Sequence, residues 1–178
     1  MVKEVISIKN SRLIKPIYLN CRINRNGPTY DINPLKTDPR TKELGLELED
    51  LMPSYFVIVN PKAHRGGIRG HYHNKKKEIY SLINGRLIFF VSDLSGNREI
   101  IDFDTRIPNN VKEGEKIKFP VVYLPPKVAH LVYNPLNYTQ TLLVLSRYSD
   151  EEAFKGGDII EFDAIGGELK KVASEIKL

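Results

Sequence analysis

The sequence predicts an all-β protein built as a closed barrel or jelly roll. From residue 54 onward, short apolar runs follow one another, turn residues separate them, and few segments show a helical period. A closed barrel or double sheet of this kind hides its strand edges from solvent. The 178 residues, 41% of them hydrophobic, suit one globular domain with a sizeable core. We expect a single domain over 1–178, with an N-terminal extension (1–53), a barrel core (54–148) and a C-terminal extension (149–178).

The N-terminal extension gives the weakest pattern. Residues 2–8 and 14–23 are expected to form short strands, and Asn26-Gly27-Pro28 is typical of a turn. Asp38 followed by Pro39 combines a helix N-cap with proline at the first helical position. We therefore expect a short helix that begins there, runs to about residue 43 and ends at Gly45.

The barrel core is read as a series of strands at short spacing. They are expected over 54–59, 68–73, 78–83, 86–92, 98–103, 116–124, 129–133 and 139–146. Asn84-Gly85 is the pair typical of a two-residue hairpin, and residues 94–97 predict another tight connection. In the C-terminal extension we expect a strand over 158–162 and a short helix within 167–178, where apolar residues fall at helical spacing.

Two segments carry the residues most suited to chemistry. In the first, at 69–85, His71 and His73 stand two apart, so on a strand both imidazoles face the same side. A polar turn then brings Glu78 to the start of the next strand. About fifty residues later, a second segment offers His130 on another strand. Three imidazoles and one carboxylate form an N3O donor set for a divalent transition metal such as Zn, Fe, Mn, Ni or Cu.

The two segments resemble the two cupin motifs. The spacing HxHxxxxExxxxxxG occurs at 71–85 and PxxxxHxxxN at 125–134; Lys127 stands where the second motif usually has glycine. The resemblance implies a cupin double-stranded β-helix, or jelly-roll barrel, here with short N- and C-terminal helical additions. It also implies that His71, His73, Glu78 and His130 bind metal. Since cupins often pair through edge strands, it implies a homodimer as well.

Parts of the chain are similar to sugar-nucleotide enzymes within this superfamily. Residues 65–73 resemble the RGxxRGxHY run of the dTDP-4-dehydrorhamnose 3,5-epimerases, and residues 123–130 resemble their IPPGFAH. Residues 147–152 resemble the loop that closes their barrel. The cupin domains of capsular sugar-nucleotide epimerases and ketoisomerases are closer still, because some keep RGxHxHxxxxE. These likenesses span roughly residues 56–154 and imply a carbohydrate isomerase or epimerase of polysaccharide biosynthesis.

The chemistry that this resemblance implies is proton abstraction from a carbon next to a ketone. It needs a base with a pKa near neutrality and a group that stabilises the enolate. Histidine meets the first need. Carried over, His71 matches the base of the family and His73 stands beside it, while Arg65 or Arg69 would contact the phosphates of a nucleotide-linked or phosphorylated sugar.

A metal at the histidines would change these roles. An imidazole nitrogen that binds metal cannot also accept a proton, so the metal would act as a Lewis acid and another group as the base. His64, Tyr72 and Tyr133 are the candidates. The strand that carries the tyrosine acid of the epimerases reads Thr-Leu-Leu-Val-Leu at 141–145, without a phenol.

Other functions stay open at this point. The segments Gly70 to His73, Glu78 to Tyr80 and 123–134 are also similar to archaeal cupin-type glucose-6-phosphate isomerases. In that family the glutamate stands two residues later and a threonine-rich phosphate loop precedes the first histidine, so we rank this alternative second. Another metal-dependent cupin, such as an oxygenase, and a non-catalytic cupin that binds a small ligand are the further alternatives.

Composition excludes several classes of protein. The net charge is +5, with Lys and Arg scattered along the chain, and no helix-turn-helix, zinc-finger or RNP-type signature accompanies it, so no nucleic-acid partner is expected. No run approaches the roughly 18 apolar residues of a membrane span, and no signal-peptide pattern is present, which predicts a cytoplasmic protein with no membrane partner. The single cysteine, Cys21, excludes an internal disulfide.

Several other residues have a structural interpretation. Lys75 to Lys77 are expected at the solvated tip of a hairpin, and His64 in a loop. Most of the tyrosines on the predicted strands, Tyr72, Tyr80, Tyr123 and Tyr133, are expected to pack in the barrel.

Overall fold

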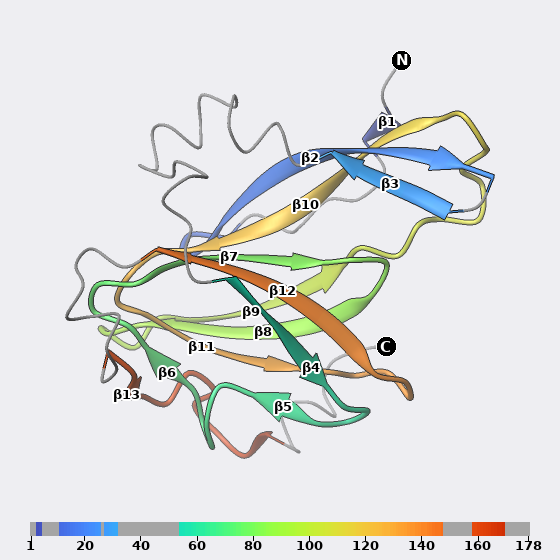
Figure 1. Cartoon of the computed structure of the whole chain (residues 1–178). Coiled ribbons are helices and arrows are strands. Elements are labelled where there is room, and N and C mark those ends of the chain that lie inside the picture. The colour runs from blue at the N-terminus through green and yellow to red at the C-terminus, as the bar shows by residue number, and fades with distance from the viewer. Residues whose placement is uncertain (1–2, 5–10, 26, 32–53, 148–157, 170–178) are drawn as a thin grey trace.

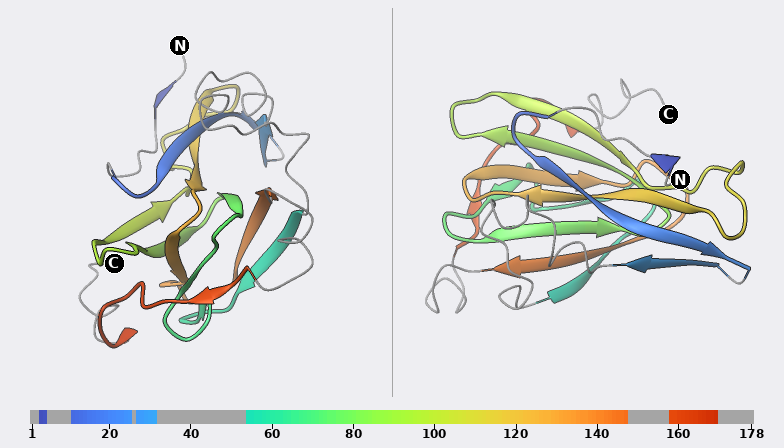
Figure 2. Two further views of the ribbon diagram at one scale, coloured as in Figure 1. Left: turned by 90° about the vertical axis from the view of Figure 1, so that its left-hand side faces the viewer. Right: turned by 90° about the horizontal axis from the view of Figure 1, so that it is seen from above.

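The computed structural model describes residues 3–4, 11–25, 27–31, 54–147 and 158–169. Its strands form two sheets that face each other around one core (Figures 1 and 2). The first sheet has the order β3-β2-β10-β7-β12-β4, with β1 beside β10, and the second has the order β13-β6-β11-β8-β9, with β5 beside β11. This arrangement confirms the predicted jelly-roll barrel.

The first sheet contains the strands β1 (Lys3–Glu4), β2 (Lys15–Asn24), β3 (Gly27–Asp31), β4 (Ser54–Val59), β7 (Lys77–Leu82), β10 (Lys116–Leu124) and β12 (Gln140–Arg147). The second contains β5 (His64–Arg65), β6 (His71–Tyr72), β8 (Arg86–Asp93), β9 (Arg98–Asp104), β11 (Val128–Tyr133) and β13 (Ile160–Glu161). Apart from the short β1, β5, β6 and β13, the expected strands agree with the observed spans to within about one residue. β3 was not expected: it begins at Gly27, inside the segment 26–28 that was expected to form a turn. In the N-terminal extension, β2 and β3 continue the first sheet beyond β10 (Figure 1).

The main core lies between the two sheets. Its buried side chains come from β4, β7, β10 and β12 on one side and from β8, β9 and β11 on the other. Phe89 in β8 is central: its ring meets the Tyr80 ring at 5.4 Å and the Phe103 ring at 5.6 Å, both edge to face. Full burial of such a side chain stabilises the fold by about 1.5–3 kcal/mol. The packing therefore fixes Tyr80, which also reaches the cavity described below.

The expected hairpin at Asn84-Gly85 is wrong. β7 already pairs with β10 on one edge and β12 on the other, so it has no edge left for β8, and the two residues carry the chain from the first sheet to the second. Asn84 has a φ of 51°, in the left-handed region. A Cβ at Gly85 would come within 1.9 Å of the Gln140 side-chain oxygen, which accepts a hydrogen bond from the Arg86 N–H. Close packing at a crossing, rather than a hairpin, explains this glycine.

The expected tight connection at 94–97 is confirmed as the β8–β9 hairpin. One carboxylate oxygen of Asp93 accepts hydrogen bonds from the backbone N–H groups of Ser95 and Asn97, each at 2.9 Å.

The expected strand over 68–73 is reduced to β6, because Gly66, Gly67 and Gly70 before it have positive φ angles. The strand over 158–162 is likewise reduced to β13.

The two expected helices fall outside the described residues, except for 167–169 at the start of the second, and they stay predictions. Within the part of the chain that is described, no helix has the length and apolarity to cross a membrane.

A candidate active site in the barrel cavity

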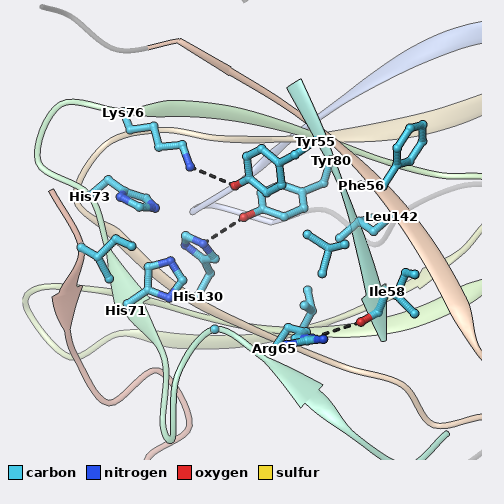
Figure 3. A pocket seen from close by; sticks show the side chains of 14 residues that line it. Tyr55, Phe56, Ile58, Arg65, His71, His73, Lys76, Tyr80, His130 and Leu142 are labelled. Atoms are coloured by element: carbon cyan, nitrogen blue, oxygen red, sulfur yellow. Dashed lines mark hydrogen bonds between the residues drawn. The ribbon is translucent and has the colours of Figure 1, made fainter. Parts of the chain in front are cut away.

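A cavity of about 390 Å³ lies within the barrel, and residues 55–58 of β4 form part of its lining. This volume falls within the range of small-ligand sites. Figure 3 shows its polar wall, where the rings of His71, His73 and His130 gather on one side and the hydroxyl groups of Tyr55 and Tyr80 lie on the other.

The strand pairing explains why the three histidines meet. His71 in β6 and His130 in β11 are direct partners across an antiparallel pair, and their ring centroids are 4.5 Å apart. His73 follows two residues after His71, and the two rings stand at 86° with centroids 4.9 Å apart. One nitrogen from each of the three rings lies within 4.8 Å of the others. The structure therefore brings together the three imidazoles that the two motifs singled out.

His73 is held by a contact distant in the sequence. Its Nδ1 lies 2.7 Å from the backbone carbonyl oxygen of Asp158. A carbonyl can only accept, so Nδ1 carries the hydrogen and Nε2 of the neutral ring has a free lone pair. Nε2 is buried and has no hydrogen-bond partner among the described residues. Burial lowers the pKa of His73, as do the nearby Lys76 and His71 charges, against the opposing effect of Glu78.

His130 is oriented in the same way. Its Nδ1 donates to the backbone oxygen of Val128 at 3.2 Å, and its Nε2 lies 3.0 Å from the Tyr80 hydroxyl. Burial lowers the pKa of His130 to about 4, although Glu78 opposes the shift, so the ring is neutral at neutral pH. His71 is half-buried at the cavity wall, and neither of its ring nitrogens has a hydrogen-bond partner in the described parts of the chain. His71 thus offers the most accessible lone pair of the cluster.

Glu78 lies behind the histidines, with each carboxylate oxygen engaged. Oε1 is 2.5 Å from the Lys76 ammonium nitrogen and accepts a hydrogen bond from the Tyr55 hydroxyl at 3.1 Å. Oε2 accepts one from the Tyr80 hydroxyl at 2.9 Å and lies 3.3 Å from His130 Nε2 and 3.6 Å from His73 Nε2.

The ionisation of Glu78 follows from these partners. Burial by itself raises its pKa, but the positive charges of His130, Lys76 and His73 outweigh burial and lower the pKa to about 2. Because His130 is neutral at neutral pH, Lys76 supplies the standing positive charge. Burial likewise lowers the pKa of Lys76 in itself, while the Glu78 carboxylate more than offsets this and raises it. The pair is therefore an ammonium and a carboxylate, both about 95% buried or more.

The placement of Lys76 corrects the sequence interpretation. Lys75 is exposed as expected, but Lys76 is 5% exposed and also donates to the Tyr55 hydroxyl at 3.0 Å. The backbone N–H groups of residues 74–76 all donate to the Asp158 carboxylate, at 2.9 to 3.2 Å. Because β6 and β7 belong to different sheets, the segment crosses the end of the barrel instead of forming a hairpin tip, and one lysine side chain points inward.

Of the other candidate residues, the structure places one at the cavity and four away from it. Arg65 lies at the wall, where its Nε donates to the Ile58 carbonyl oxygen at 3.0 Å. Arg69 points elsewhere and forms an ion pair with Asp163 at 2.7 Å. Tyr72 and Tyr133 pack in a second apolar cluster, on the faces of β6 and β11 away from the core, and His64 is exposed on β5. None of these last three residues lines the cavity.

Sequence reasoning missed Tyr55, Tyr80 and Lys76. Tyr80 had a signal: it follows Glu78 by two residues on the same strand, so the two side chains share a face. Tyr55 comes from β4, distant in the sequence, and becomes a neighbour only through the pairing of β4 with β12.

The donor atoms of this cluster are of the kind that a divalent transition metal prefers. Three imidazoles present nitrogen donors close together, two of them are oriented by carbonyl oxygens through their other nitrogen, and His73 Nε2 has no competing partner among the residues described. Glu78 fits less well, because Lys76 and the two tyrosine hydroxyls already engage its oxygens.

Stability should depend on pH through the buried histidines. The folded pKa of His130 lies near 4, below the ordinary 6.5, so its contribution is full above pH 6.5 and is lost as the pH falls toward 4. We expect the free energy of unfolding in urea, measured with a chelator present, to fall by on the order of 1–3 kcal/mol between pH 7.5 and 4.5. His130→Gln should remove much of this fall and His64→Gln should keep it. A flat wild-type profile would contradict the assignment.

Comparison with known proteins supports the fold. The chain is similar to a sugar 3,4-ketoisomerase (QdtA) from Thermoanaerobacterium thermosaccharolyticum in complex with TDP, with 17% identity, a TM-score of 0.55, and coverage of 92% of this chain and 94% of that one. It is also similar to a 4-keto-6-deoxy sugar epimerase (NovW) from Streptomyces spheroides, with 14% identity, a TM-score of 0.58, and coverage of 84% and 72%.

A third similar structure is a TDP-quinovose 3,4-ketoisomerase (WlaRB) from Campylobacter jejuni, with 15% identity, a TM-score of 0.55, and coverage of 93% and 100%. No family model and no curated protein matches the sequence. At these identities the likeness shows a shared fold, in agreement with the jelly-roll barrel predicted from the two motifs.

Proposed function

We propose that this chain is a carbohydrate epimerase or isomerase that removes a proton from the carbon next to a ketone of a nucleotide-linked sugar. The observation that carries the proposal is the arrangement of the cavity: an accessible imidazole, His71, lines the same cavity as the hydroxyl groups of Tyr55 and Tyr80. Such chemistry needs these two elements, a base and a group that stabilises negative oxygen. The similar structures named above support the same class of reaction, since they are ketoisomerases and an epimerase.

His71 is the proposed base. A ring nitrogen of the neutral imidazole accepts the proton from the carbon, the C–H bond breaks, and its electron pair moves to give the enolate oxygen. Return of the proton to the opposite face of the same carbon gives an epimer. Return to the neighbouring carbon, with a proton shift between the oxygens, gives the isomeric ketone. His73, held by Asp158, shapes the wall beside His71.

The hydroxyl groups of Tyr55 and Tyr80 are the proposed donors toward the enolate oxygen. In the structure each donates its single hydrogen to Glu78, so the hydroxyl that serves the enolate would turn its hydrogen from the carboxylate to the substrate. Burial, with the charge of Glu78, raises the pKa of Tyr80 well above its ordinary value, so it keeps its proton at neutral pH. Burial raises the pKa of Tyr55 as well. Tyr72 and Tyr133 were named from the sequence as candidate bases, but both side chains pack in the apolar cluster outside the main core, so we assign neither a role in the reaction.

The rim of the cavity suits a nucleotide. Arg65 is an exposed residue of the cavity lining and is the proposed contact for phosphate, in preference to Arg69, which pairs with Asp163 elsewhere. Phe56 and Ile58 line the same rim and are 70% and 53% exposed. An exposed aromatic ring in the lining can stack on a nucleotide base, and a simple sugar phosphate has no base to stack there. This observation favours a nucleotide-linked sugar over a sugar phosphate.

We further propose that the cluster can bind a divalent transition metal, Zn, Fe, Mn or Ni, through His71, His73 and His130, with Glu78 as the carboxylate ligand. When bound, such an ion would supply Lewis-acid polarisation of the ketone. The proposed base needs a free nitrogen on His71, so the role of His71 as base belongs to the metal-free site. A cytoplasmic location and a homodimer formed through edge strands stay predictions.

Solvent exchange tests the function. Purified protein in deuterium oxide, given keto-sugar nucleotides that include the TDP-4-keto-6-deoxyglucose bound by a similar structure, should place deuterium on a carbon next to the carbonyl, as followed by NMR. Exchange with sugar phosphates alone would favour the sugar-phosphate isomerase alternative. Oxygen uptake by iron-loaded protein would favour an oxygenase. Binding of a sugar nucleotide without exchange would leave a non-catalytic cupin and overturn the proposal.

A further inference from the structure

We propose that Lys76 keeps divalent metal binding weak at the histidine cluster, because its ammonium group already pairs with Glu78, the carboxylate that would add negative charge to the ligand set. The inference concerns the same cavity as the proposed reaction, but it rests on the geometry of Glu78 and holds whether or not the chain is an epimerase.

Glu78 is shared between two sets of partners. Its Oε2 faces the imidazoles, 3.3 Å from His130 Nε2 and 3.6 Å from His73 Nε2, while its Oε1 lies 2.5 Å from the Lys76 ammonium. The side chains of Lys76 and Glu78 are 5% and 2% exposed. A metal held by the imidazoles would therefore approach the same carboxylate that Lys76 already neutralises.

The Lys76 ammonium and a divalent metal ion would compete for the negative charge of Glu78. The imidazoles bind a metal as neutral ligands, so Glu78 is the source of negative charge in the cluster. Lys76 cancels that charge, and a divalent ion would add two positive charges to a buried, electrically balanced group. In a medium of low polarity, repulsion between the ion and a nearby ammonium is strong and poorly screened. Without the Lys76 charge, the carboxylate would instead attract the ion.

The position of Lys76 is built into the fold. Its backbone N–H and those of the two preceding residues donate to the Asp158 carboxylate, which fixes the turn. Its ammonium donates to the Tyr55 hydroxyl at 3.0 Å and lies 5.1 Å from the centre of the Tyr55 ring. The lysine therefore cannot swing out to solvent without breaking several contacts. This fixed charge leaves a nitrogen of His71 available to accept a proton.

Neutral substitutions at Lys76 test the inference directly. Lys76→Met removes the charge at similar length, and Lys76→Gln removes the charge but keeps a hydrogen-bond donor. Titration of Zn²⁺ against a competing chelator should show binding at least about tenfold tighter in both variants than in the wild type. Zn²⁺ should also raise the unfolding temperature more in the variants. Lys75→Met, an equal loss of charge at an exposed neighbour, should leave Zn²⁺ affinity unchanged.

Each possible result of these titrations either supports or contradicts the proposed role of Lys76. Wild-type protein that keeps nearly one equivalent of metal after dialysis against a chelator would overturn the inference, as would neutral variants that bind Zn²⁺ no more tightly than the wild type. If a variant is unfolded without metal, refolding on addition of Zn²⁺ would support the inference and failure of both variants to refold would contradict it. Deuterium exchange by the wild type tests the proposed reaction separately, so either idea can fail alone.

Discussion

His71→Asn is expected to lower the rate of deuterium exchange into a keto-sugar nucleotide by about 10²–10⁴-fold, the usual contribution of a positioned acid or base. Asparagine has a similar shape but cannot accept the proton. Because His71 makes no hydrogen bond to other residues in the described structure, its replacement should leave the unfolding temperature nearly unchanged. Rates followed by NMR at several substrate concentrations should show the loss in kcat more than in KM.

His64→Asn is the matched control, because His64 is exposed on β5 and does not line the cavity. It should keep the wild-type rate. An equal loss in both variants, or full activity in His71→Asn, would exclude His71 as the base. If His71→Asn keeps full activity, a His73 variant should show the loss of exchange rate instead, because His73 is the other histidine of the first motif that lines the cavity.

Glu78→Ala is expected to reduce the free energy of unfolding by about 3–5 kcal/mol, because it leaves the Lys76 ammonium buried without its counter-charge. The pair is almost fully buried, with the two side chains 5% and 2% exposed. The double variant Lys76→Met/Glu78→Gln removes both charges and should recover much of the loss. Urea unfolding at pH 7.5, monitored by circular dichroism, measures each value.

Arg69→Ala provides the comparison for an exposed ion pair. Arg69 and Asp163 are 52% and 34% exposed, so breaking this pair should cost about 0–1 kcal/mol. If Glu78→Ala costs no more than Arg69→Ala, the Lys76 ammonium has found water or another partner, and the buried charge pair does not have the importance that the geometry indicates.

The sequence predicted the features that depend on local pattern. Apolar runs and turn residues located most strands, and the two-residue spacing of His71 and His73 placed both rings on one face. The prediction that His130 lies beside these two histidines came from the resemblance to the cupin motifs, because no local sequence pattern relates residues 71 and 130. The strand pairing of these two residues shows why the motifs occur together.

The features that sequence reasoning missed depend on which strands share a sheet. Asn84-Gly85 has the composition of a hairpin turn, yet both edges of β7 are taken by other strands. Three consecutive lysines suggested solvent, yet Asp158 folds their turn over the barrel so that Lys76 points inward. Tyr133 and Arg69 stand near the motifs in sequence, but strand alternation and the Asp163 ion pair direct them away.

Asp158 makes two sets of contacts that the site needs before it is complete. Its backbone oxygen fixes His73 and its carboxylate fixes the turn of Lys76, across a separation of 85 residues from His73. Contacts so distant in the sequence form late, because the closure of a long loop must precede them. During synthesis, the histidines of the first motif leave the ribosome well before Asp158 does. The imidazole of His73 and the turn that carries Lys76 therefore reach their observed positions only once the segment of Asp158 has docked, so completion of the site depends on a segment outside both histidine motifs.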